Sequence, residues 1–187
     1  MAITTLDPRT ALIVVDLQNG MAALTAVPSI SEVIRRAATL ADAFRRHGLP
    51  IVLVNVAGGA PGRTEQARHM GTPPAGWIDI VPELKQQPDD VVVTKHTWGS
   101  FTNTNLASYL KDREVTQVVI VGVATSIGVE STARQAHELG FNVTLAVDAM
   151  TDRSPEAHSN SITLIFPRLG ETGSAQEIID LLDKERE

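Results

Sequence analysis

The sequence contains five short apolar runs in which valine, isoleucine and other β-branched residues dominate. None of these runs follows an alternating apolar and polar pattern, so each is typical of a strand buried on both faces. Strands of this kind belong to parallel sheets that helices cover on each side. The runs span residues 11–15, 51–54, 91–93, 118–121 and 143–147.

Segments with helical periodicity lie between these runs. Ser29 and Glu32 form the sequence pattern of a capping box, and Gly48 predicts the end of the helix that follows. Strands and helices therefore alternate, which predicts an open α/β sheet with right-handed crossovers. The other predicted helices cover residues 104–112, residues 126–140, the segment from the Ser154-Pro155 cap to before Pro167, and the segment after the Ser174–Glu177 capping box.

Composition narrows the classes of function. The 187 residues include 16 Lys and Arg against 22 Asp and Glu, and this net charge of −6 argues against a nucleic-acid surface. No apolar run approaches the roughly 18–20 residues that span a bilayer, and residues 1–10 lack the apolar stretch of a secretory signal. We therefore expect no nucleic-acid or membrane partner and a cytoplasmic location. Cysteine is absent, which excludes a disulfide, a thiolate nucleophile and a cysteine-ligated metal.

Polar residues that follow the apolar runs mark the candidate site. In an open α/β sheet, ligands bind outside the carboxyl ends of the strands, near the point where the strand order reverses. Asp16 follows the first run, Lys95 follows the third, and the turn 122–128 follows the fourth. Each feature also has a structural interpretation: an aspartate that accepts backbone N–H groups, a solvated lysine and glycines that permit a tight turn. Position alone therefore leaves the function open.

The combination of motifs is more specific. The sequence has Asp-Leu-Gln-Asn at 16–19, Lys95 with Phe101 six residues later, and Gly-Val-Ala-Thr-Ser-Ile-Gly-Val-Glu-Ser-Thr-Ala-Arg at 122–134. In these motifs the chain resembles the isochorismatase-like hydrolases of the cysteine hydrolase superfamily, over about residues 10–182. The resemblance implies one domain over residues 1–187, built as a Rossmann-like α/β/α sandwich with a mostly parallel sheet of about six strands.

The resemblance also implies roles for individual residues. The family's catalytic aspartate and lysine fall on Asp16 and Lys95. The family's non-proline cis peptide bond falls at Val123–Ala124, where the N–H groups of Ala124 and Gly128 would face an oxyanion. Because relatives form dimers and tetramers, we expect a homo-oligomer that acts on a small molecule.

The chain departs from the family pattern at its nucleophile. The family's cysteine falls on Gly128, so a thiol amidase is excluded. The Asp-x-His metal pattern of nicotinamidases has no counterpart at 55–58, and we expect neither a metal nor another cofactor. Ser126 is a nearby hydroxyl, but a serine hydrolase needs a base within hydrogen-bond reach of it. This leaves a serine mechanism as a minor alternative.

Chemistry that needs an acid and a lysine, but no nucleophile, fits the hydrolysis of a vinyl ether on a small carboxylated substrate. Asp16 would donate a proton, and Lys95 would bind a substrate oxygen. Since a nearby lysine lowers the pKa of an aspartate, burial would have to outweigh it. The alternative is a non-catalytic descendant of the same fold that binds a small anion or serves as a structural oligomer.

Other residues are predicted to contact the substrate or close the site. The stretch from Ala57 to Pro82 is rich in glycine and proline and too long for an ordinary connection, so we interpret it as a functional loop or lid. If it folds over the site, Trp98 would lie at the mouth. Gln18 would orient the acid or the substrate. The remaining predicted contacts are Ala124 and Thr125 at the start of the turn. Gly58 stands where isochorismatases have a glutamine for the substrate carboxylate, and Arg63, Gln66 and Arg68 are possible replacements.

Overall fold

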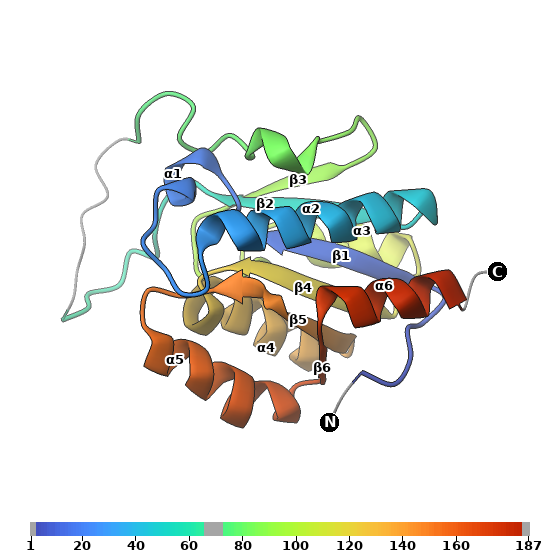
Figure 1. Ribbon diagram of the computed structural model, residues 1–187. Helices are drawn as coiled ribbons and strands as arrows, with labels where there is room; N and C mark the ends of the chain where they lie inside the picture. Colours follow the sequence, from blue (N-terminus) through green and yellow to red (C-terminus); the bar gives the residue numbers. More distant parts are fainter. Residues whose placement is uncertain (1–2, 66–72, 185–187) are drawn as a thin grey trace.

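The computed structural model describes residues 3–65 and 73–184, and its centre is a six-stranded parallel sheet (Figure 1). The strand order is β3-β2-β1-β4-β5-β6, and every neighbouring pair is parallel. The five predicted strands are all present. The sixth strand has only three residues and contains no apolar run that would predict it. The strands are β1 (Thr10–Val15), β2 (Ile51–Val56), β3 (Val91–Lys95), β4 (Gln117–Val123), β5 (Asn142–Thr151) and β6 (Glu171–Gly173).

Helices cover both faces of the sheet, which confirms the predicted three-layer α/β/α sandwich (Figure 1). On one face, α2 (Ile30–Arg46) and α6 (Ala175–Lys184) pack against the sheet and against each other. On the other face lie α3 (Leu106–Asp112) and α4 (Glu130–Glu138), followed by α5 (Pro155–Asn160) and its continuation. That continuation comprises η3 (Ser161–Ile165) and η4 (Phe166–Arg168).

The central strands supply side chains to two separate cores. Along β1, Leu12 and Val14 lie in the cluster under α2, while Ile13 and Val15 lie in the cluster under α3 and α4. Because both faces are covered, the strand has no polar face and its sequence is continuously apolar. The prediction of two buried faces is wrong for β3. This strand forms the edge of the sheet and alternates buried with exposed residues, leaving Val92 42% exposed.

The predicted caps begin the helices as expected. The Ser29 hydroxyl accepts a hydrogen bond from the Glu32 N–H at 3.4 Å, and the Ser174 hydroxyl accepts one from the Glu177 N–H at 3.2 Å. The segment predicted as one helix from Ser126 differs. It begins as the π-helical turn η2 (Thr125–Val129) before α4 continues it. The four-residue α1 (Asn19–Ala22) has no side-chain cap and was not predicted.

The later part of the predicted lid is hydrogen-bonded to the segment that follows β1. Backbone N–H groups of Asn19 and Gly20 donate to the carbonyls of Asp79 and Trp77, both at 2.9 Å. The Trp77 ring lies so close to Gly20 that a Cβ there would be 2.0 Å from it. This part of the loop, residues 77–79, is therefore held beside α1, and we call it the wall. The earlier candidates Gln66 and Arg68 lie outside the described residues, and Arg63 is exposed.

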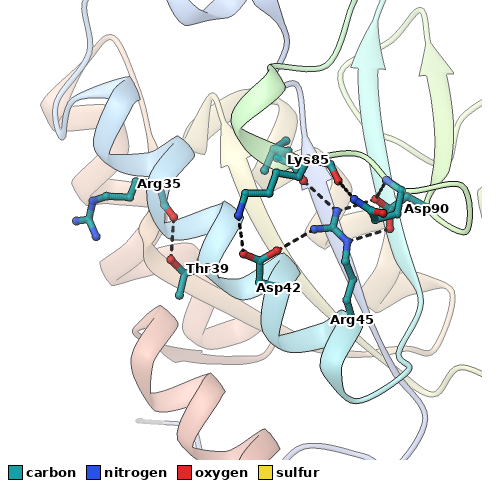
Figure 2. Close-up of polar contacts among 8 residues, drawn as sticks. Arg35, Thr39, Asp42, Arg45, Lys85 and Asp90 are labelled. Carbon is teal, nitrogen blue, oxygen red and sulfur yellow. Dashed lines mark hydrogen bonds and ion pairs between the residues drawn. The ribbon is translucent and has the colours of Figure 1, made fainter.

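Charged contacts fasten the chain after the wall to α2 (Figure 2). The Arg45 guanidinium bonds to Asp90 at 2.7 Å, to Asp42 at 3.1 Å and to the carbonyl of Leu84 at 3.0 Å, where η1 (Pro82–Leu84) ends. Lys85 pairs with Asp42 at 3.4 Å. A groove of about 500 Å³ lies between α2 and this segment, and its lining includes none of the predicted site residues. Among the described residues, no helix combines the length and apolar character needed to cross a membrane.

Candidate active site

Asp16 and Lys95 form a buried ion pair at the carboxyl ends of the strands. Asp16 follows β1 and Lys95 ends β3, so the lysine reaches across the intervening strand β2. The Lys95 Nζ donates to Asp16 Oδ2 at 2.8 Å and to the Thr97 carbonyl at 3.1 Å. Asp16 is 5% exposed and Lys95 2% exposed. The two residues that the sequence singled out therefore meet, away from bulk solvent.

The environment of Asp16 favours its protonated form. Burial raises the pKa of this carboxyl from 3.8 to about 6, although the charge of Lys95 and its hydrogen bond lower it. Burial thus outweighs the lysine, as acid catalysis requires. The second oxygen, Oδ1, is buried and has no hydrogen-bond partner. The residue also has a φ of 55°, in the left-handed region that non-glycine residues rarely occupy.

The turn after β4 brings Gly128 to this pair. The strand order reverses between β1 and β4, and residues from both ends meet there. Gly122, with a φ of 122°, packs so tightly that a Cβ would lie 2.0 Å from the Val15 carbonyl oxygen. A Cβ on Gly128 would lie 3.2 Å from Asp16 Oδ2 and 2.9 Å from the Val123 carbonyl oxygen. Position 128 therefore faces the acid, and a side chain there would require the Val123 carbonyl to shift.

Side chains from the end of β5 and from α5 hold the same turn. The N–H and the hydroxyl of Ser126 both donate to Asp152 Oδ2 at 2.8 Å. The Thr125 hydroxyl lies 2.8 Å from Nδ1 of His158. Burial lowers the pKa of His158, although the charge of Asp152 raises it. Ser126 thus contacts a carboxylate rather than an imidazole, as expected for a residue that turns away from the acid. The peptide bond Val123–Ala124 is cis, as the resemblance implied.

Residues 10–177 match the sequence profile of the isochorismatase domain. The chain belongs to the isochorismatase family. The uncharacterized isochorismatase family protein YwoC of Bacillus subtilis (strain 168) is 39% identical over 92% of this chain and 93% of its own. The ureidoacrylate amidohydrolase RutB of Pseudomonas savastanoi pv. phaseolicola (strain 1448A / Race 6) is 30% identical over 79% of this chain and 72% of its own. Relatives within the family, RutB among them, are hydrolases.

A solved structure supports the same assignment. The isochorismatase family protein from Burkholderia thailandensis superposes with a TM-score of 0.93 at 40% identity, covering 97% of this chain and 100% of the other. The likeness confirms the predicted α/β/α architecture over almost the whole chain.

In this isochorismatase family member, the predicted contact residues Gln18, Ala124 and Trp98 differ in burial and in hydrogen bonding. Gln18 is buried, and its amide oxygen accepts from the Val56 N–H at 2.7 Å while its nitrogen donates to the carbonyls of Val56 and Trp77. It therefore joins the end of β2 to the wall. The Ala124 carbonyl accepts N–H groups within the turn, and Trp98 is 61% exposed. Contact of these residues with substrate stays a prediction.

Sequence reasoning missed Asp152 and His158. The apolar run was predicted to end at residue 147, whereas β5 continues to Thr151 and places Asp152 directly after it. The Asp148 carboxylate accepts the Ala175 N–H at 2.7 Å. Within residues 3–65 and 73–184, no cluster of three or more His, Asp or Glu side chains is arranged to hold a metal ion.

Proposed function

We propose that this chain hydrolyses a small carboxylated vinyl ether by acid catalysis, with Asp16 as the proton donor and Lys95 beside it. The observation that carries the proposal is the buried pair of Asp16 and Lys95, in which the pKa of Asp16 is raised to about 6. At pH 7 this pKa leaves roughly a tenth of the carboxyl protonated, compared with less than about 1% at the ordinary value of 3.8. The absence of cysteine and the backbone contact at position 128 support a mechanism without a covalent intermediate.

The hydrogen bonds of the pair indicate which oxygen carries the proton. Oδ2 accepts from the Lys95 ammonium, whereas Oδ1 has no partner. A proton on the acid therefore resides on Oδ1, because a proton on Oδ2 would be repelled by the ammonium group that already donates to that oxygen. Lys95 also orients the carboxyl, because its own position is fixed by the Thr97 carbonyl.

The proposed reaction balances without another reagent. Oδ1 gives its proton to the terminal alkene carbon, and the ether oxygen stabilises the resulting cation as an oxocarbenium ion. Asp16 becomes a carboxylate as this positive charge forms, which lowers the energy of the transition state. Water adds to the cation and returns a proton to Asp16. The hemiketal then collapses to a ketone and an alcohol.

The test is pyruvate release from isochorismate and related enolpyruvyl ethers, followed with lactate dehydrogenase. In D₂O the pyruvate should carry one deuterium in its methyl group, because the transferred proton exchanges with solvent. The rate should fall as pH rises through about 6, the pKa of Asp16. Asp16→Asn should abolish release, and turnover that survives this substitution would exclude Asp16 as the donor.

One observation favours the alternative, a non-catalytic protein that binds a small anion or assembles as a structural oligomer. Solvent reaches almost none of Asp16 or Lys95. A substrate could reach the pair only after surrounding groups move. No turnover across the panel, together with a thermal shift by small acids, would favour binding without catalysis.

A further inference from the structure

Thr132 connects the two segments that contribute the site. It lies on α4 and is completely buried. Its hydroxyl donates to the Gly128 carbonyl at 2.7 Å. The same oxygen lies 3.2 Å from the donating Ser100 N–H and 2.9 Å from the Ser100 hydroxyl. One side chain thus contacts both the turn after β4 and the loop after β3.

These contacts form a chain of hydrogen bonds that runs from Lys95 to the turn beside Asp16. The Lys95 Nζ binds the Thr97 carbonyl, and the Thr97 hydroxyl donates to the Gly99 carbonyl at 3.0 Å. The next residue in the chain is Ser100, which contacts Thr132. Thr132 bonds to Gly128, and a Cβ at position 128 would lie 3.2 Å from Asp16 Oδ2, so this turn lies next to the acid. The Thr132 hydroxyl therefore connects the loop that fixes Lys95 directly to the turn beside Asp16. Gln135, also on α4, holds the next two residues of the loop by accepting from the Phe101 N–H and donating to the Thr102 hydroxyl.

The hydrogen bonds of Thr132 use its full capacity. A hydroxyl has one donor and two acceptor lone pairs. The donor is taken by Gly128, so the Ser100 hydroxyl must donate, and the two lone pairs accept from the Ser100 N–H and hydroxyl. A side chain without a hydroxyl would leave buried polar groups of both segments unpaired.

We propose that Thr132 is a positioning residue, which sets the distance between the Lys95 ammonium and the Asp16 carboxylate by holding the Ser100 loop against the Gly128 turn. The proposal adds this residue to the acid catalysis proposed above and rests on it for its consequence in turnover. Its structural part concerns only the ion pair and can be measured without any substrate.

The experiment compares Thr132→Val with Thr132→Ser in the full chain. Valine keeps the shape and excludes water but removes the hydroxyl, whereas serine keeps the hydroxyl. The readout is the titration of Asp16, followed by the carboxyl ¹³C chemical shift in labelled protein, with Asp16→Asn to assign the signal. Since Lys95 lowers the pKa of Asp16, a loosened pair should titrate above about 6 in Thr132→Val. Thr132→Ser should titrate like the wild type.

Thr144→Val is the matched control. Thr144 is also a completely buried threonine, and its hydroxyl accepts from Gln117 Nε2 at 2.9 Å in the sheet. Its loss should lower the melting temperature and leave the Asp16 titration unchanged. If Thr132→Val does not fold, Ser100→Ala takes its place, because it removes one bond of the same contact. A titration like the wild type in Thr132→Val, or in Ser100→Ala in that case, overturns the proposal.

Turnover supplies a second readout if the chain is active on an enolpyruvyl ether. Thr132→Val should then lower kcat by about tenfold or more with a smaller change in KM, because misplacement affects the chemical step. Thr132→Ser should restore kcat. Absence of turnover in the wild type would refute the proposed reaction, while the Asp16 titration would still decide the role of Thr132.

Discussion

Replacing Lys95 by methionine tests whether the buried pair has the electrostatics described above. Burial raises the pKa of Asp16 in the folded protein from 3.8 to about 6. The folded state therefore binds this proton more tightly than the unfolded chain, so the wild type loses stability as pH rises between these two values. At 1.36 kcal/mol per unit, the loss amounts to about 3 kcal/mol and is complete above pH 6.

The substitution should extend this loss to higher pH. Lys95 lowers the pKa of Asp16 by its charge and its hydrogen bond, so Lys95→Met should move that pKa above 6. The variant would then keep losing about 1.4 kcal/mol per pH unit above pH 6, where the wild type no longer does. The difference in the free energy of unfolding should be nearly constant at pH 5 and below. Between pH 6 and pH 8 it should grow by up to about 3 kcal/mol, and the full increase requires a pKa of about 8 or higher for Asp16 in the variant.

Urea unfolding at pH 5, 6, 7 and 8 measures this difference directly. Lys85→Met is the control, because Lys85 is 67% exposed and its pair with Asp42 should contribute less than about 1 kcal/mol without this pH trend. A difference for Lys95→Met that stays constant between pH 6 and pH 8 would refute the reasoning. It would show that the pKa of Asp16 in the variant is no higher than in the wild type, either because Lys95 does not lower it or because water reaches the carboxyl once the lysine is gone.

Three further substitutions test the surroundings of the site. Gly128→Cys places a Cβ 2.9 Å from the Val123 carbonyl oxygen, so it should lower the stability by about 1–3 kcal/mol in thermal unfolding. An unchanged melting temperature would mean that the backbone of the turn shifts at little energetic cost. Gln18→Met leaves the Val56 N–H without its acceptor and should cost about 1–3 kcal/mol by urea unfolding, unlike a surface glutamine such as Gln176. Arg45→Met removes the Arg45 contacts drawn in Figure 2 and should make the chain around Leu84 and Asp90 more sensitive to proteolysis at native pH. Equal cleavage rates would contradict an anchoring role.

The sequence was sufficient to predict five strands of the sheet from strong local signals, whereas the pairing of Asp16 with Lys95 was implied by the family resemblance. Continuous apolar runs occur where helices cover a strand on both faces, and polar residues at the ends of such runs meet at one edge. The same rule failed for β3, since a run of valines does not reveal that the strand lies at the edge of the sheet. The end of β5 was missed because polar residues interrupt its apolar pattern before the strand stops.

The roles of Thr132 and Gln18 could not be predicted in the same way. Thr132 contacts Ser100, 32 residues away in the chain, and Gln18 contacts Val56, 38 residues away. A threonine within a helix and a glutamine after a strand are common on protein surfaces, so their residue types carry no signal of burial. Only the three-dimensional structure shows that their hydrogen-bonding groups are used by distant backbone and side chains.

The close approach of the Val123 carbonyl to position 128 has a consequence for any attempt to install a thiol in this site. A cysteine placed there would need the backbone carbonyl to move before its Cβ could be accommodated, so its sulfur would not start from an unstrained position beside Asp16. An engineered thiol hydrolase built on this chain would therefore need changes in the turn as well as the cysteine itself.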